Sequence, residues 1–380
     1  MERTPADVLG LAFDAASRRM SEPHIQDAGI QAKVEAVCRD LRNRACARFI
    51  LATALMKAYR PEVDIRKPYT EIGDADAYSG RSIDEVYISP FVAQYALPCN
   101  PTTAFLTPAF RNWNATLTPD LVMVGRPASL YKATLELLAA VQEGRVSAFE
   151  TLAESIRQLL MLRDEQKEQI SSLLASLKRL GGKSELSSEA VVNLVQQHLA
   201  ISHSSRLPVL VVAAAYSAAE AHLGERVLPL AAHNAADEQT GALGDVQIAL
   251  IDEDRVVTGY EMKTRCVTVN DIDRALAKVA ASGEPVDNYI FITTEPIEQS
   301  VKDYAKAVYE QTGSLEVVIL DCIGFLRHYL HLFHRLRGEF LDAYQRLVLD
   351  EPASAVEQPL KVAFLALRQA AESASQPLSD

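Results

Sequence analysis

Residues 244–263, GDVQIALIDEDRVVTGYEMK, are the stretch of sequence that decides the fold of the second half of this chain. Their polarity alternates with a period of two, which is typical of β-strands with one buried face. The polar run Asp252-Glu253-Asp254 interrupts the alternation and predicts a turn. The stretch therefore predicts a β-hairpin.

The register of this hairpin follows from the same pattern. Pairing the two strands about Glu253 sets Asp245 opposite Glu261. Because side chains two residues apart share a strand face, Lys263 projects to the same side as these two carboxylates. A slip of one residue would expose the apolar face, so burial fixes the register. The apolar face comprises Val246, Ile248, Leu250, Val256, Tyr260 and Met262.

The polar face of the hairpin predicts a divalent-metal site. Two carboxylates across a strand pair repel each other unless a cation lies between them, and Mg²⁺ prefers oxygen ligands. We expect Asp245 and Glu261 to bind Mg²⁺, with the main-chain carbonyl of Met262 as a third ligand. Lys263 would orient the attacking water or stabilise charge on a phosphate. The alternative is an ordinary surface hairpin with charged exposed positions.

The elements around the hairpin predict a mixed α/β sheet. An apolar helix and a short strand are expected before it, and helices alternate with strands after it. This order is typical of a sheet with helices on its faces. The predicted elements are the helix Leu207–Leu223, the strand Arg226–Leu230, the helix Asp271–Ala281, the strand Asn288–Thr294, the helix Pro296–Thr312, the strand Leu315–Leu320 and a long final helix, Gly324–Leu349.

The segment resembles the PD-(D/E)xK nuclease superfamily. Asp245 stands at the first acidic position of the motif, Glu261-x-Lys263 forms its second half, and Gly244 replaces the proline. The chain is also similar to type II restriction endonucleases of the SacI type from about Arg44 to Leu349. The stretches that carry this likeness are Ser205–Pro208, His233–Asp237, Leu243–Asp245 and the Glu261–Lys263 strand.

The resemblance implies a fold, an activity and partners. The fold would be an α/β, mixed-sheet PD-(D/E)xK core (αβββαβ-like) after a mostly helical N-terminal domain. The activity would be Mg²⁺-dependent hydrolysis of double-stranded DNA at a short specific sequence. A homodimer and a cognate DNA methyltransferase are the implied partners. Two alternatives stay open: a repair or modification-dependent nuclease of the same fold, and a non-catalytic DNA-binding protein that keeps this fold.

Composition limits these functions. With 380 residues, of which 48% are hydrophobic, the chain is long enough for two folded domains. A net charge of −12 argues against a protein that coats DNA, but a specific enzyme needs only local basic contacts. Five scattered cysteines without zinc-site spacing predict reduced thiols. No apolar run reaches transmembrane length and no signal peptide is expected, so we predict a cytoplasmic protein without membrane contact.

Three segments are expected along the chain. Residues 1–182 would form a helical domain with Pro-rich loops for DNA recognition or dimerisation, residues 183–351 the endonuclease domain, and residues 352–380 a helical tail. The helices expected in the first segment are Ala32–Tyr59, Leu130–Gln142 and Ala148–Leu180. The first of these would carry a basic strip that either follows a phosphate backbone or is a solvated face: Arg39, Arg42, Arg44 and Arg48.

Several residues outside the trio are candidates for DNA or metal contacts. The loops between Pro61 and Pro127 carry residue types that bind base edges, namely Arg81, Arg111, Asn112 and Asn114. The alternative for Arg81 is an internal ion pair with Asp84 and Glu85. Arg265 and Arg274 would contact phosphates. Glu220, His233 and Asp237 would assist the metal or the scissile phosphate, or else serve as a surface carboxylate and as loop braces.

Overall fold

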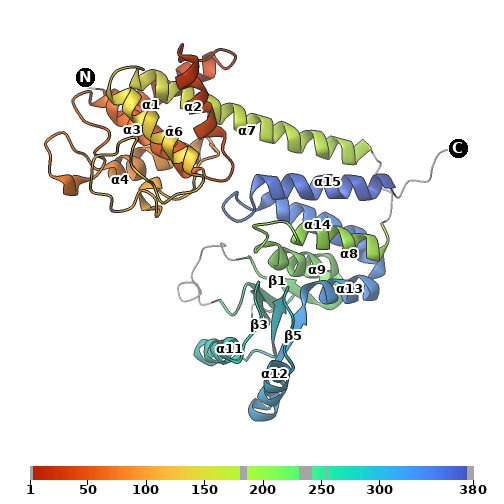
Figure 1. The fold of residues 1–380 in the computed structure, drawn as a ribbon. Coiled ribbons are helices and arrows are strands. Elements are labelled where there is room, and N and C mark those ends of the chain that lie inside the picture. The colour runs from red at the N-terminus through yellow and green to blue at the C-terminus, as the bar shows by residue number, and fades with distance from the viewer. Residues whose placement is uncertain (1–2, 180–185, 231–241, 254, 284, 375–380) are drawn as a thin grey trace. The chain divides into compact units, whose positions relative to one another are not determined.

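The structure is a computed structural model that describes residues 3–179, 186–230, 242–253, 255–283 and 285–374 (Figure 1). The chain divides into two compact units, Met1–Glu168 and Gln169–Asp380. The division falls inside helix α7 (Ala148–Arg179), because Leu177 near its end packs in the core of the second unit. The boundary expected at residues 182 and 183 lies outside the described residues.

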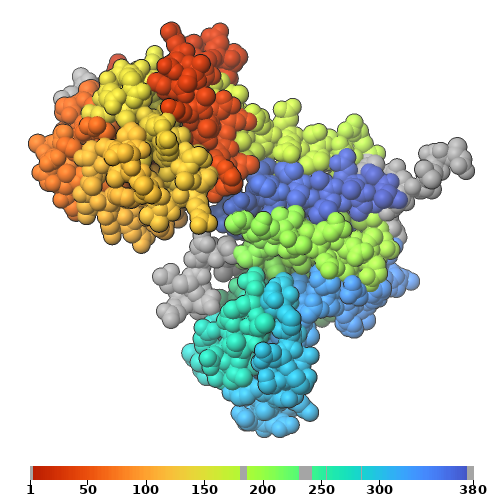
Figure 2. Space-filling model, viewed as in Figure 1, coloured from red at the N-terminus to blue at the C-terminus, as the bar shows by residue number. Residues whose placement is uncertain are grey.

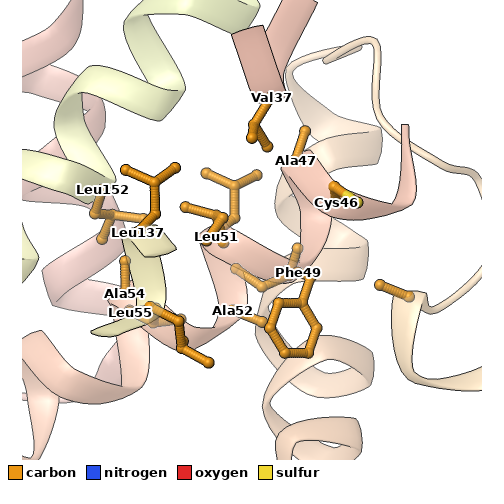
Figure 3. Close-up of a cluster of buried hydrophobic side chains, with 14 of the residues drawn as sticks. Val37, Cys46, Ala47, Phe49, Leu51, Ala52, Ala54, Leu55, Leu137 and Leu152 are labelled. Carbon is orange, nitrogen blue, oxygen red and sulfur yellow. The ribbon is translucent and has the colours of Figure 1, made fainter. Parts of the chain in front are cut away.

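The first unit is helical, as predicted. Helix α3 is its centre, because every residue from Ala45 to Met56 is buried. Figure 3 shows Leu51 and Leu55 of α3 close to Leu137 of α6 and Leu152 of α7. The longer helices are α1 (Pro5–Arg18), α2 (Ala28–Arg39), α3 (Ala45–Tyr59), α6 (Ala128–Gln142) and α7.

Prolines limit regular structure between residues 61 and 127, as expected. Every residue of this region is described. Its one longer helical stretch, residues 80–94, has a π-helical middle, and the rest contains two 3₁₀ turns of three residues each. These elements are η1 (Thr70–Ile72), α4 (Gly80–Ile83), η2 (Asp84–Ile88), α5 (Ser89–Gln94) and η3 (Ala104–Leu106).

The prediction of a single helix over Ala32–Tyr59 is wrong. The helix ends at Arg39 because the side chain of Asp40 accepts hydrogen bonds from the backbone N–H groups of Arg42 (2.8 Å) and Asn43 (3.0 Å). Asn43 in turn accepts a bond from the backbone N–H of Ala45 at 3.1 Å, where α3 begins. Short polar side chains that bond nearby backbone groups compete with the helix in this way.

The break also disperses the expected basic strip. Arg39 pairs with Glu165 of α7 at 2.5 Å. Arg48 points into the core, where its guanidinium lies 2.8 Å from the carboxylate of Asp84 and both side chains are buried. A continuous basic helix face over this segment is therefore excluded.

The second unit contains a five-stranded mixed sheet, in agreement with the predicted α/β class. The strands lie in sequence order, β1 (Glu225–Val227), β2 (Val246–Leu250), β3 (Val256–Lys263), β4 (Asn288–Thr293) and β5 (Glu316–Asp321). Strand β2 pairs antiparallel with both β1 and β3, whereas β3, β4 and β5 run parallel to one another. Helices connect the parallel strands, as crossover connections require.

Helices cover both faces of this sheet. One face carries Val246 and Tyr260 and shares a hydrophobic core with five helices, of which α9 and α13 lie against its strands while the other three pack on those helices (Figure 1). The other face carries Tyr289 and Phe291 and packs against α11 and α12, which lie side by side at the surface in Figure 2. The five helices are α8 (Ser188–Leu199), α9 (Leu207–Leu223), α13 (Cys322–Leu332), α14 (Arg337–Asp350) and α15 (Gln358–Ala374), and the remaining two are α11 (Val269–Ser282) and α12 (Gln299–Thr312).

The prediction of one final helix over Gly324–Leu349 is wrong. Helix α13 ends at Leu332, and the 3₁₀ turn η4 (His334–Leu336) separates it from α14. The break lets Phe333 and Phe340 pack against the same ring, that of Tyr329, at centroid distances of 5.3 and 5.9 Å. The aromatic packing therefore outweighs the continuity of the helix.

Two general expectations are tested by this fold. All five cysteines are free, and only Cys266 is exposed, which confirms the prediction of unpaired thiols. Within the described ranges, no helix is both long and apolar enough to cross a membrane.

A buried histidine joins three helices of the second unit. His198 of α8 is fully buried. Its Nδ1 lies 3.0 Å from the hydroxyl of Tyr344 in α14, and its Nε2 lies 3.0 Å from the carbonyl oxygen of Leu360 in α15. Burial lowers the pKa of His198 to about 4, although the Leu360 carbonyl partly opposes this shift. The imidazole is therefore neutral in the folded protein near pH 7.

This histidine should make the stability of the second unit depend on pH. Its pKa is about 6.5 in an unfolded chain, so the unfolded state binds the extra proton first. The stabilisation is complete above about pH 6.5 and falls toward about pH 4, by at most about 1.4 kcal/mol per pH unit. Urea unfolding of the wild type and of His198→Gln over this range checks it. An equally steep loss in the variant would contradict the assignment to His198.

Candidate active site

The predicted trio lies where β3 ends, at the carboxyl-terminal end of the parallel strands in the second unit. The ladder pairs Val246 with Tyr260 and residue 247 with residue 259, so Asp245 stands beside Glu261 one step beyond the last paired residues. Strand β3 ends at Lys263, and β2 begins next to Asp245 because the two strands are antiparallel. The predicted register is thus observed at the end of the hairpin that carries the carboxylates.

The register changes farther along the hairpin. A β-bulge lies between Ile248 and Ala249, where Ala249 pairs with Val256 and Ile248 pairs with Thr258. The extra residue in β3 turns Val257 toward the core that contains Val246, and it turns Val256 toward the opposite face. The assignment of Val256 to the first face is therefore wrong, but the bulge does not reach Asp245 or Glu261.

Gly244 allows the chain to approach β3 closely. Its φ angle is +148°, and a Cβ atom at this position would lie 2.4 Å from the carbonyl oxygen of Tyr260. The backbone at Gly259 in β3 approaches Leu243 equally closely, since a Cβ atom at residue 259 would lie 2.4 Å from the carbonyl oxygen of Leu243. Neither proline nor alanine fits at residue 244, so the occurrence of glycine here has a steric cause.

Asp245 is anchored by this close approach. One of its carboxylate oxygens, Oδ2, accepts a hydrogen bond from the backbone N–H of Met262 at 2.7 Å. The bond runs across the end of the sheet to the residue next to Glu261. It fixes the aspartate at the end of β3.

Glu261 lies on the sheet face covered by α11 and is mostly buried. Its side chain is 14% exposed and accepts hydrogen bonds from Lys263, from Lys278 of α11 (3.3 Å) and from the hydroxyl of Tyr289 (2.5 Å). Burial alone would raise the pKa of Glu261, but these donors and the two lysine charges hold it below the usual value. The carboxylate is therefore ionised at neutral pH.

A third carboxylate, that of Asp271, binds cationic side chains beside the trio. The side chain of Asp271 is fully buried and pairs with Arg265 (2.6 Å) and Arg274 (2.5 Å), while Lys263 lies 3.8 Å away. Burial raises the pKa of Asp271, but bonds from Arg265 and Thr268 hold it well below its usual range. Arg265 and Arg274 are 52% and 66% exposed, so both guanidinium groups reach solvent close to the trio.

The cluster around Glu261 and Asp271 gathers cations although the chain is acidic. Four cationic side chains and three carboxylates belong to it. The cations are Lys263, Arg265, Arg274 and Lys278, and the carboxylates are Asp245, Glu261 and Asp271. Asp321 also lies at this end of the sheet, so it is the exposed guanidinium groups of Arg265 and Arg274, rather than a net positive charge, that suit a polyanion.

The donor set fits Mg²⁺. Among the described residues there is no group of three or more His, Cys, Asp and Glu side chains that could hold a metal. Mg²⁺ does not require such a group, because it is often bound by one or two carboxylates and keeps its remaining waters. Two lysines lie against the mostly buried carboxylate of Glu261, because a buried negative charge must be balanced by positive charge. A divalent cation at the same end of β3 would supply such a charge.

The other predicted metal-site residues are not brought into the trio. Glu220 is an exposed residue of α9. His233 and Asp237 lie outside the described residues. The side chain of Met262 is partly buried against the core of the second unit, and only its main-chain groups face the edge that holds Asp245.

The four predicted base-contacting residues belong to the first unit. Arg81 forms an exposed ion pair with Glu85 at 2.8 Å, whereas Asp84 pairs with Arg48, so the expected cluster of Arg81 with both acids is only partly present. Arg111 donates to the carbonyl oxygen of Leu106 at 2.8 Å.

The two asparagines have a conformational role. Asn112 and Asn114 have φ angles of +56° and +46°, a left-handed backbone that asparagine adopts more readily than most residues. Trp113 between them packs against the core and donates from its indole N–H to the carbonyl oxygen of Ala109 at 2.6 Å. The left-handed backbone explains why asparagine occurs at both positions. Their side-chain amides lie on a loop.

Sequence analysis missed three residues of the site. Lys278 and Tyr289 reach Glu261 from α11 and β4, and Asp271 organises the arginines. A signal existed for Asp271, because Thr268-x-x-Asp271 is a capping-box pattern and the structure contains that box at the start of α11. Lys278 is one helical turn beyond Arg274, a spacing that places both on one face. Tyr289 gave no such signal, because its contact depends on the pairing of β3 with β4.

Comparison with known proteins gives no family for this chain. No protein-family model matches it, and a search of curated proteins finds no match. The function is therefore inferred from the residues of the site and their geometry.

The close approach at Gly244 can be tested by substitution. Gly244→Ala should lower the free energy of unfolding by about 1–3 kcal/mol, because it combines a strained φ angle with a contact to the Tyr260 backbone. Gly338→Ala is the control, since this glycine lies in α14 with no atom near its Cβ position and should be neutral or stabilising. Urea unfolding measures both. Equal stability of the two variants would rule out the steric explanation.

Proposed function

We propose that this chain is a Mg²⁺-dependent endonuclease of the PD-(D/E)xK type that hydrolyses double-stranded DNA at a short specific sequence, as type II restriction endonucleases do. The observation that carries the proposal is the placement of Asp245, Glu261 and Lys263 together at the end of β3, in a mixed sheet flanked by helices. The element order α9, β1, β2, β3, α11, β4 supports an αβββαβ nuclease core.

The residues of the trio have distinct roles. Asp245 and Glu261 would hold Mg²⁺, with the carbonyl of Met262 as a third ligand, and the bound ion would supply charge stabilisation for the phosphate and a lower pKa for the attacking water. Lys263 orients that water or stabilises the developing charge, since its ammonium group lies beside Glu261. The water oxygen bonds to phosphorus, the bond from phosphorus to one sugar oxygen breaks, and that oxygen takes up a proton.

Two parts of the chain would contact DNA. Arg265 and Arg274 are held by Asp271 with their guanidinium groups exposed, which suits phosphate contacts beside the trio. The loop residues of the first unit would contact base edges: Arg81, Arg111, Asn112 and Asn114. A cytoplasmic homodimer working beside a cognate DNA methyltransferase follows from the resemblance.

The activity is tested with DNA of defined methylation. Incubation of the protein with unmethylated phage and plasmid DNA in Mg²⁺ should give discrete fragments. EDTA or Lys263→Ala should abolish them, whereas Lys132→Ala, which changes an exposed lysine of the first unit, should not. Mapping the fragment ends would identify the recognition sequence. No cleavage of methylated or unmethylated DNA would overturn the proposal and favour a DNA-binding role.

Because the two carboxylates and Lys263 have different roles, their variants should affect metal binding and DNA cleavage differently. Asp245→Asn and Glu261→Gln should weaken Mg²⁺ or Mn²⁺ binding measured by calorimetry, because each removes a charged ligand. Lys263→Ala should keep cation binding but slow cleavage by at least about 100-fold. Glu150→Gln, an exposed carboxylate of the first unit, is the control for charge alone. Unchanged cation binding in both carboxylate variants would exclude the metal site.

A further inference from the structure

The two edges of the sheet in the second unit differ. Strand β1 forms one edge, has only three residues and includes the charged side chains of Glu225 and Arg226. Strand β5 forms the other edge, has six residues and is apolar from Val317 to Leu320. Short and charged edges resist pairing with another chain, whereas a longer apolar edge without lysine or proline favours it. Within the part of the chain that the structure describes, β5 pairs only with β4.

Helix α12 and strand β5 together form a groove at this edge. Its volume is about 450 Å³, and its apolar wall includes Ala305 and Val318. Tyr309 lines the same groove and is 52% exposed, so part of its ring is open to a partner. An apolar edge beside an exposed aromatic residue is suited to protein association.

The charges in this groove are separated along its length. Only residues 313–315 join α12 to β5, so the helix and the strand run in opposite directions. Glu310 and Glu316 therefore lie at the end where β5 begins, and Lys302 lies toward the end where β5 finishes, with Lys306 one turn away from it on the same helix. All four side chains are exposed. Among the residues that line the groove, the acidic side chains therefore lie at one end and the basic side chains lie toward the other.

A groove with this charge pattern is complementary to itself. A two-fold rotation perpendicular to the sheet sets two β5 strands antiparallel and two α12 helices antiparallel on the same face. The acidic end of each copy then meets the basic end of the other, as an isologous interface requires. Asp321 at the end of β5 is not among the residues that line the groove, and its carboxylate accepts hydrogen bonds from the backbone N–H groups of Ile323 and Gly324 at the start of α13.

We propose that the groove between α12 and β5 binds the same groove of a second copy of this chain. The two β5 strands pair antiparallel about a two-fold axis, and the two sheets become one continuous sheet. Tyr309 of each copy is covered by the helix of the other. The proposal deepens the homodimer of the proposed function by naming its interface. Association is measured without DNA or metal, so its failure is distinguishable from a failure of cleavage.

Charge reversal tests the two-fold geometry. Sedimentation equilibrium of the full chain over the micromolar range should give a dimer. The double variant Lys302→Glu/Lys306→Glu and the double variant Glu310→Lys/Glu316→Lys should each raise the dissociation constant by at least about ten-fold, because like charges then meet across the axis. Combining all four substitutions restores complementarity and should restore the dimer. This recovery also shows that the loss in the double variants is not caused by unfolding.

Two further variants complete the experiment. Val318→Lys places a charge on the edge strand and should give a monomer with an unchanged circular dichroism spectrum. Lys132→Glu changes an exposed lysine of the first unit and should leave the dimer intact. A monomeric wild type at every concentration would overturn the proposal. So would dimerisation of both double variants at wild-type strength, or a monomeric four-fold variant.

Discussion

The close approach of Gly244 to the backbone of Tyr260 is the constraint on which the candidate site depends. A side chain at residue 244 would collide with the carbonyl oxygen of Tyr260, and the absence of one lets the segment before β2 lie directly against β3. In this position the carboxylate of Asp245 accepts a hydrogen bond from the backbone N–H of Met262. That bond ties Asp245, which directly precedes β2, to the strand that carries Glu261. A side chain anchored to a strand in this way is better ordered than one without such support.

The electrostatics of the site follow from the burial of Glu261. An ionised carboxylate that is mostly removed from water must be paired, and here two lysines and a tyrosine supply the partners. Under the proposed function, the same cations would become available to a phosphate when a divalent ion neutralises Glu261. Asp271 extends this arrangement by holding Arg265 and Arg274 at the surface. An acidic chain can therefore present exposed cations beside the candidate site.

The sequence predicted those features that depend on local pattern. The alternation along the hairpin gave the pairing of Val246 with Tyr260, because only that register buries one whole face. It missed the bulge, which arises where β3 carries one residue more than β2. The helix breaks near Asp40 and Phe333 were also missed, since they result from side-chain bonds and aromatic packing rather than from periodicity. Glu261's partners on α11 and β4 depend on contacts between distant segments, which one sequence does not reveal.

One topological feature connects the site with the proposed dimer. Strands β3, β4 and β5 run parallel, so their carboxyl ends meet at the edge that carries Lys263 and the start of α13. The same order leaves β5 as the last strand, with α12 beside it, and gives the groove its opposite charges at two ends. Association through β5 would leave Asp245 and Glu261 accessible. Strand pairing uses the open side of β5, whereas these carboxylates lie at the ends of the inner strands. A two-fold axis through paired β5 strands would relate two such sites, and the symmetry of a palindromic DNA sequence has the same form.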